Sequence, residues 1–76
     1  MIMTNLKKFI QTIRHNNDFT ILKVELNKDN VKVKFGGLTP KLYSRLHRLA
    51  KEQDINITAH SFYKEGMNVI DVITLQ

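Results

Sequence analysis

Hydrophobic residues recur with helical spacing near the start of the chain. Apolar side chains stand at i, i+3, i+4 and i+7, the spacing that places them on one face of a helix. They are Leu6, Phe9, Ile10 and Ile13. Thr4 or Asn5 could cap this helix at its start. Residues 15–18 should end it, because their Asn and Asp side chains bond to the backbone outside helices.

A second helix is predicted after the Gly36-Gly37 pair. Thr39 is a favourable N-cap residue, and Pro40 suits the first position of a helix because its fixed φ angle is already helical. The helix should run to about Gln53. Its inward-facing residues are Leu42, Leu46, Leu49 and part of Ala50.

Alternating polar and apolar residues predict two hairpins, one after each helix. The expected strands are 19–26, 31–35, 55–62 and 67–75, with turns at 27–30 and 63–66. In the first strand, Phe19 and Ile21 are out of phase with the later apolar residues, which predicts a bulge or a twisted edge. The last strand is apolar on both faces, which indicates a central position in the sheet.

The order helix, strand, strand, repeated once, predicts an α+β domain with the sequence α-β-β-α-β-β. Elements of this length pack best as a four-stranded antiparallel sheet with both helices on one face. Right-handed connections give the strand order third, fourth, second, first. This is a circularly permuted ferredoxin-like sandwich, with its first strand moved to the C-terminus. The alternative is an α+β domain whose hairpins form a sheet across a dimer.

The two helix-strand-strand units also match each other in pattern. With a shift of 36 residues (42 minus 6), Leu6, Ile10 and Ile13 meet Leu42, Leu46 and Leu49. The single domain, residues 1–76, can therefore be divided into two halves, 4–35 and 40–75. An internal duplication, or simply two units of the same type, would explain the match.

Positive charge is concentrated in the middle of the chain. The 76 residues include 12 Lys and Arg against 7 Asp and Glu, a net charge of +5. The segment 31–51 has six basic residues and no acidic one. The basic residues are Lys32, Lys34, Lys41, Arg45, Arg48 and Lys51. Such an excess of positive charge favours polyanions or acidic protein surfaces as partners.

The composition excludes several kinds of site. The chain has no cysteine, which excludes disulfides, thiol catalysis and cysteine-based zinc sites. The three histidines lack the spacing of zinc ligands, and no Gly-rich nucleotide motif is present. No apolar run approaches the roughly 20 residues needed to cross a bilayer, and the first residues do not resemble a leader peptide. We therefore expect a cytoplasmic protein with no metal, no cofactor and no membrane partner.

Asp71 is the acidic residue within the apolar last strand. A carboxylate on a central strand must find a cation or hydrogen-bond donors, so we predict that Asp71 pairs with a basic side chain or lies at the open rim. A catalytic carboxylate also needs a second group that converges on it in a concave site. Only Glu65, on a predicted turn, is near in sequence. We therefore expect that the protein is not an enzyme.

Nucleic-acid binding is the leading functional hypothesis. Clustered cations release counterions from nucleic acid and supply most non-specific affinity. Lys41, Arg45 and Arg48 follow helical spacing and should form one outward stripe. Lys32 and Lys34 should project from the far face of the sheet. Candidates for stacking on bases are Tyr43, Phe62 and Tyr63.

Two other functions remain open. The chain could be a protein-interaction module or inhibitor, for example one encoded by a phage or mobile element, that docks on an acidic protein surface. It could also be a plain dimerisation domain whose charge only keeps it in solution. A homodimer is expected, because Ile70 and Val72 should leave aliphatic surface on the open face of the sheet.

Overall fold

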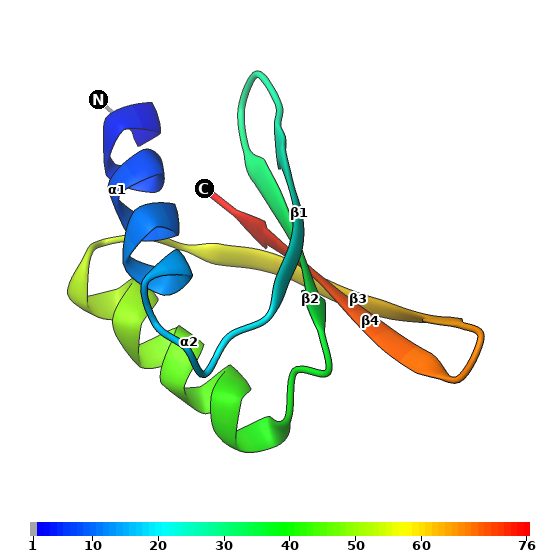
Figure 1. The fold of residues 1–76 in the computed structure, drawn as a ribbon. Helices are drawn as coiled ribbons and strands as arrows, with labels where there is room; N and C mark the ends of the chain where they lie inside the picture. Colours follow the sequence, from blue (N-terminus) through cyan, green and yellow to red (C-terminus); the bar gives the residue numbers. More distant parts are fainter. Residues whose placement is uncertain (1) are drawn as a thin grey trace.

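The computed structural model describes residues 2–76, with side chains described from residue 5 onwards (Figure 1). In chain order its elements are α1 (Ile2–Arg14), β1 (Ile21–Leu26), β2 (Val31–Gly36), α2 (Pro40–Glu52), β3 (Ile57–Glu65) and β4 (Asn68–Leu75). The predicted order α-β-β-α-β-β is therefore confirmed. Across residues 2–76, neither helix is long and apolar enough to cross a membrane.

The four strands form one antiparallel sheet in the order β1-β2-β4-β3. The predicted strand order is confirmed, with β2 and β4 at the centre. Both helices lie on one side of the sheet, and the second hairpin extends past them (Figure 1). The relation to a permuted ferredoxin-like fold and the division into two repeated halves stay predictions.

The core lies between the two helices and one face of the sheet. Val33 pairs with Ile73 and Val31 with Leu75, so the apolar sides of β2 and β4 face the helices together. All four side chains are almost completely buried. The core is completed by Phe35 of β2 and by residues of the two helices and the segments that follow them: Leu6, Phe9, Ile10, Ile13, Phe19, Leu46, Ala50 and Ile55. Burying one large apolar side chain contributes about 1.5–3 kcal/mol, so this cluster is the main source of stability.

The first strand contains the predicted bulge. Ile21 lies opposite Phe35, but Lys23 lies opposite Lys34, so Leu22 is the extra residue. The bulge lets Ile21 and Val24 both face the helices, although their separation in sequence puts them out of phase. Leu22 is turned to the other side, where its Cδ1 atom would lie 3.5 Å from a Cβ on Gly36. This placement confirms the expectation drawn from the alternation.

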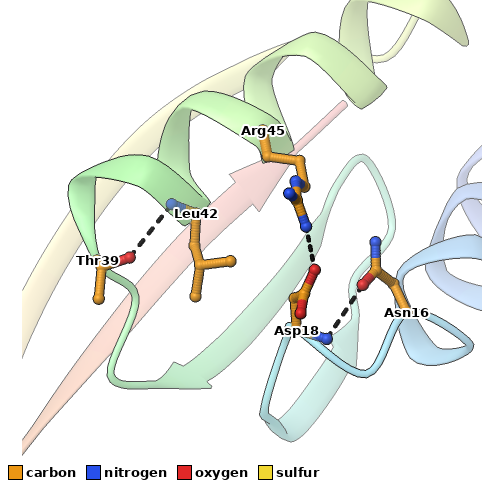
Figure 2. Close-up of polar contacts among 5 residues, drawn as sticks. All are labelled: Asn16, Asp18, Thr39, Leu42 and Arg45. Atoms are coloured by element: carbon orange, nitrogen blue, oxygen red, sulfur yellow. Dashed lines mark hydrogen bonds and ion pairs between the residues drawn. The ribbon is translucent and has the colours of Figure 1, made fainter.

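Helix α2 begins as the sequence predicts. Thr39 is the N-cap, and its Oγ1 accepts a hydrogen bond of 3.2 Å from the backbone N–H of Leu42 (Figure 2). Pro40 occupies the first helical position, where its missing N–H costs nothing. Such a cap contributes about 0.5–2 kcal/mol. Gly37, at φ 73°, supplies the left-handed residue that turns the chain from β2 into α2.

The predicted cap of the first helix is wrong. Because α1 begins at Ile2, Thr4 and Asn5 lie inside the helix, and the side chain of Thr4 lies outside the described part of the chain. Isoleucine and methionine are acceptable helix residues, so nothing in residues 2–3 stops the helix from starting earlier.

The turn of the second hairpin is shorter than predicted, and β3 is shifted toward it. The turn is formed by Gly66 and Met67 and not by residues 63–66, so β3 continues to Glu65. Gly66 adopts φ 64°, a left-handed conformation that glycine accepts without strain. Tyr63 therefore stays extended and pairs with Ile70, and Glu65 pairs with Asn68.

The open face of the sheet is less apolar than the sequence predicted. Ile70 is only 5% exposed and Val72 is partly buried, so the expectation of bare aliphatic side chains is wrong. Ile70 is the cross-strand partner of both Tyr63 and Gly36. The Tyr63 side chain and the bulged Leu22 beside Gly36 therefore flank Ile70 on its two sides.

Candidate functional site

Three cations lie along the outward face of α2. Lys41, Arg48 and Lys51 are exposed, and their spacing of seven and three residues keeps them on one side of the helix. We call these three residues the α2 stripe. Leu46 and Ala50, on the opposite side, are buried in the core and hold the helix in this orientation.

Arg45 is directed away from the α2 stripe. Its guanidinium forms an ion pair with the carboxylate of Asp18, in the loop between α1 and β1 (Figure 2). The side chain of Asn16 steadies that loop by accepting a hydrogen bond of 3.0 Å from the Asp18 N–H. The two charged side chains are 43% and 54% exposed, so water competes strongly and the pair contributes at most about 1 kcal/mol.

Lys32 and Lys34 lie on the face of the sheet opposite the helices. They alternate along β2 with Val31, Val33 and Phe35, which are buried against the helices. The Lys34 Nζ atom lies 5.8 Å from the centre of the Tyr63 ring, close enough for a cation–π contact. The six predicted basic residues therefore belong to different surfaces, and this face is separate from the α2 stripe.

Tyr43 joins α2 to the edge strand β3. Its hydroxyl oxygen lies 3.0 Å from Nε2 of His47, one helical turn later. Its ring also stacks on that of His60 in β3, with centroids 4.7 Å apart and planes inclined by 21°. The i, i+4 spacing of Tyr43 and His47 was visible in the sequence. The contact with His60 was not, because it joins two elements that only the tertiary structure brings together.

Asp71 is buried and makes polar contacts with two other segments. Its Oδ1 atom lies 2.9 Å from Nε2 of His60, and its Oδ2 atom accepts a hydrogen bond of 3.2 Å from the Leu38 N–H. The carboxylate is on the helix-facing side of β4 and the residue is 7% exposed. Asp71 therefore finds hydrogen-bond donors, as expected for a carboxylate on a central strand, but its side-chain partner is a histidine and not a lysine or arginine. Without these donors, its burial would cost several kcal/mol.

The contact between Asp71 and His60 holds the aromatic side chains in place. A carboxylate next to an imidazole can also orient the imidazole as a proton acceptor. Catalysis would in addition need a concave site around the pair. The grooves at the C-terminal end of α2 and beside Leu22 are lined by other residues. Within the described residues, no three His, Asp or Glu side chains gather as a metal site would require.

A groove runs along the C-terminal end of α2, where the helix meets the start of β3. Its volume is 490 Å³. Arg48 and Lys51 of the α2 stripe border it together with His47, and Asn56 and Ile57 lie across from them. The groove therefore connects the cations of α2 to the side of the helix that carries Tyr43 and His47. The sequence alone does not predict this groove, because it depends on the packing of α2 against β3.

Phe62 is the next residue after His60 on the same face of β3. His60 lies opposite Ile73 and Phe62 opposite Asp71, and both of these partners face the helices. Phe62 is nevertheless 70% exposed, because the second hairpin extends past α2 (Figure 1). A large exposed aromatic ring therefore lies beside the Tyr43 and His60 stack.

Comparisons with known proteins found no matching family model, no similar curated protein and no similar solved structure.

Proposed function

We propose that this protein is a small non-catalytic module that binds nucleic acid through the outer face of α2. The observation that carries the proposal is the α2 stripe, in which Lys41, Arg48 and Lys51 are all exposed on one side of a helix. Phosphates placed along this side would displace their counterions, which is the main source of non-specific affinity. Arg48 and Lys51 also border a groove in which a sugar-phosphate chain could lie.

The open face of the sheet is a weaker candidate for phosphate binding. Lys32 lies directly opposite Glu25 on the neighbouring strand. Glu25 also lies 3.6 Å from the Nζ atom of Lys23. Negative charge is thus mixed with positive charge on this face, which weakens the attraction for a polyanion. We assign Lys32 and Lys34 a secondary role in long-range attraction.

Arg45 contributes less than its neighbours in this proposal, because its guanidinium is already paired with Asp18. A phosphate could take the place of the carboxylate, since exposed ion pairs exchange partners at little cost. Tyr43 faces β3 and belongs to the edge of the binding surface.

Charge reversal at Arg48 tests the proposal. Fluorescence anisotropy should detect binding of labelled DNA or RNA that weakens steeply as salt increases. Arg48→Glu should raise Kd by about tenfold or more and lower the slope of log K against log[salt] by roughly 1. The matched control is Lys7→Glu, which makes the same change of charge at an exposed position of α1 and should have a much smaller effect.

Two results would contradict the proposal. The absence of binding to every nucleic acid at low salt would exclude it and leave an acidic protein partner as the better explanation. Equal losses in Arg48→Glu and Lys7→Glu would show that total charge, and not the α2 stripe, governs binding. The homodimer and the cytoplasmic location remain predictions, and sedimentation at several protein concentrations would test the first.

A further inference from the structure

Three aromatic side chains come from α2 and from the helix-facing side of the neighbouring strand β3. Tyr43 stacks on His60 at a centroid distance of 4.7 Å. Phe62 follows His60 on the same face of β3 and is 70% exposed. We call Tyr43, His60 and Phe62 the aromatic patch. An exposed phenylalanine costs free energy in water, so its position beside two other rings calls for an explanation.

Two of the three rings, Tyr43 and His60, are held by polar contacts. Asp71 fixes the His60 ring through a contact of 2.9 Å, and His47 holds the Tyr43 hydroxyl at 3.0 Å. The Asp71 carboxylate is in turn tied to the chain just before α2 by the Leu38 N–H. Rings that are already oriented lose little conformational freedom when a flat ligand stacks on them.

The two elements that carry the aromatic patch also carry exposed cations. Lys41 and Arg48 are exposed on α2, the helix that carries Tyr43, and Lys64 follows Phe62 on the same face of β3. Aromatic rings next to cations form the combination that binds single strands, because bases stack on the rings while phosphates contact the cations.

We propose that the aromatic patch stacks on unpaired bases, so that the ligand of this protein is a single-stranded nucleic acid. The inference rests on the function proposed above and names its substrate class. In a duplex, the faces of the bases are covered by their neighbours and cannot reach a protein ring. A single strand of nucleic acid that follows the α2 stripe would place its phosphates on Lys41 and Arg48 and its unpaired bases toward β3.

Phe62→Ala is the first test. Kd should be measured for one labelled oligonucleotide as a single strand and as a duplex, in DNA and in RNA form. Loss of one stacked base should raise Kd for single strands by at least about fivefold, with little change for duplex. Phe62→Tyr, which keeps an aromatic ring, should restore binding. Tyr63→Ala removes a neighbouring ring on the other face of β3 and should change Kd less than twofold.

A tryptophan at position 62 gives a direct reading of stacking. The chain contains no tryptophan, so Phe62→Trp introduces a single indole whose fluorescence reports on this site alone. Single strands should quench this fluorescence in proportion to the bound fraction, whereas duplex should leave it almost unchanged. Circular dichroism should give the same folded spectrum for all three variants at position 62, because this residue contributes little to the core.

The outcomes separate this inference from the proposed function. If duplex binds as tightly as single strand, and Phe62→Ala changes neither while Arg48→Glu weakens both, then the stacking proposal is wrong and nucleic-acid binding survives. If no nucleic acid binds, both proposals fail. If only the RNA or only the DNA single strand binds and quenches, the inference holds and the class of strand is identified.

Discussion

The two halves of the chain have the same order of elements but bury different parts of their hairpins. Val31 and Val33, at the start of β2, are 0% exposed. The residues 36 positions later are Met67, which is 101% exposed, and Val69, which is 40% exposed. Positions that correspond in the sequence pattern therefore lie in the core in one half and in solvent in the other.

Strand length and direction explain the difference. β1 and β2 have six residues each, whereas β3 has nine and β4 has eight. Because β4 runs antiparallel to β2, its last residues lie beside the first residues of β2, as Leu75 does beside Val31. The end of β4 therefore fills the core, and its beginning projects past the helices with the end of β3 (Figure 1).

The two hairpins therefore contribute unequally to the core. The first half buries Val31, Val33 and Phe35 on the helix-facing side of its hairpin, although Leu26 on the same side is 59% exposed. The second half completes the core with one end of its hairpin and leaves the other end free, next to the helix that carries the α2 stripe. A domain of this size has a thin stability margin, so burial that one hairpin lacks must be supplied by the rest of the core.

The largest expected effect comes from comparing one phenylalanine in each half. Phe35 is 1% exposed and its ring lies 6.0 Å from that of Phe19. Phe35→Ala should lower the free energy of unfolding by about 3–5 kcal/mol, because it leaves a cavity in the core. Phe62→Ala should change it by less than about 0.5 kcal/mol. Urea unfolding followed by circular dichroism measures both, and similar losses would show that the second hairpin is packed as tightly as the first.

Substitution of Asp71 tests the polar contacts that this residue makes in the second half, at a position where the first half has a buried phenylalanine. Asp71 occupies the position that corresponds to Phe35 (71 minus 36) and lies directly opposite that residue. Asp71→Ala should lower stability by about 1.5–3 kcal/mol, because Leu38 and His60 lose a charged hydrogen-bond partner. Asp29→Ala, in the exposed turn of the first hairpin, is the control and should stay within about 0.5 kcal/mol. An unchanged stability in Asp71→Ala would mean that these contacts are not formed in solution.

The smallest expected effect on stability concerns the ion pair that joins the two halves. Asp18→Asn removes the partner of Arg45, and the free energy of unfolding should change by less than about 1 kcal/mol. If α2 binds nucleic acid, the same variant should bind about twofold more tightly, because Arg45 becomes free to contact a phosphate. Asp29→Asn removes the same charge far from Arg45. Equal gains in the two variants would mean that only total charge matters.

Local pattern predicted most of the fold. Each strand and helix was identified from its alternation or helical spacing, and Thr39-Pro40 marked the start of α2 because cap preferences act over a few residues. The phase change between Ile21 and Val24 predicted the bulge. Two errors lie where a terminus or turn was inferred from composition, at the start of α1 and at residues 63–66, and a third concerns Ile70 and Val72, which neighbouring side chains cover. In the second hairpin, a single left-handed glycine, Gly66, set the end of β3.

The candidate site was only half predictable. The cations of α2 could be read from charge and spacing, because an exposed helix face needs no tertiary partner. The partner of Arg45 could not, since Asp18 lies 27 residues earlier. The stack of Tyr43 on His60 was likewise missed, because it joins a helix to an edge strand.

The sequence by itself determined which elements form, which of their faces are apolar and where positive charge gathers, because these properties depend on neighbours a few residues apart. Only the tertiary structure decided that Asp71 meets His60, that Arg45 is occupied and that Phe62 is exposed. Those outcomes depend on how far β3 and β4 extend past the helices and on which residues the pairing of the strands places opposite one another.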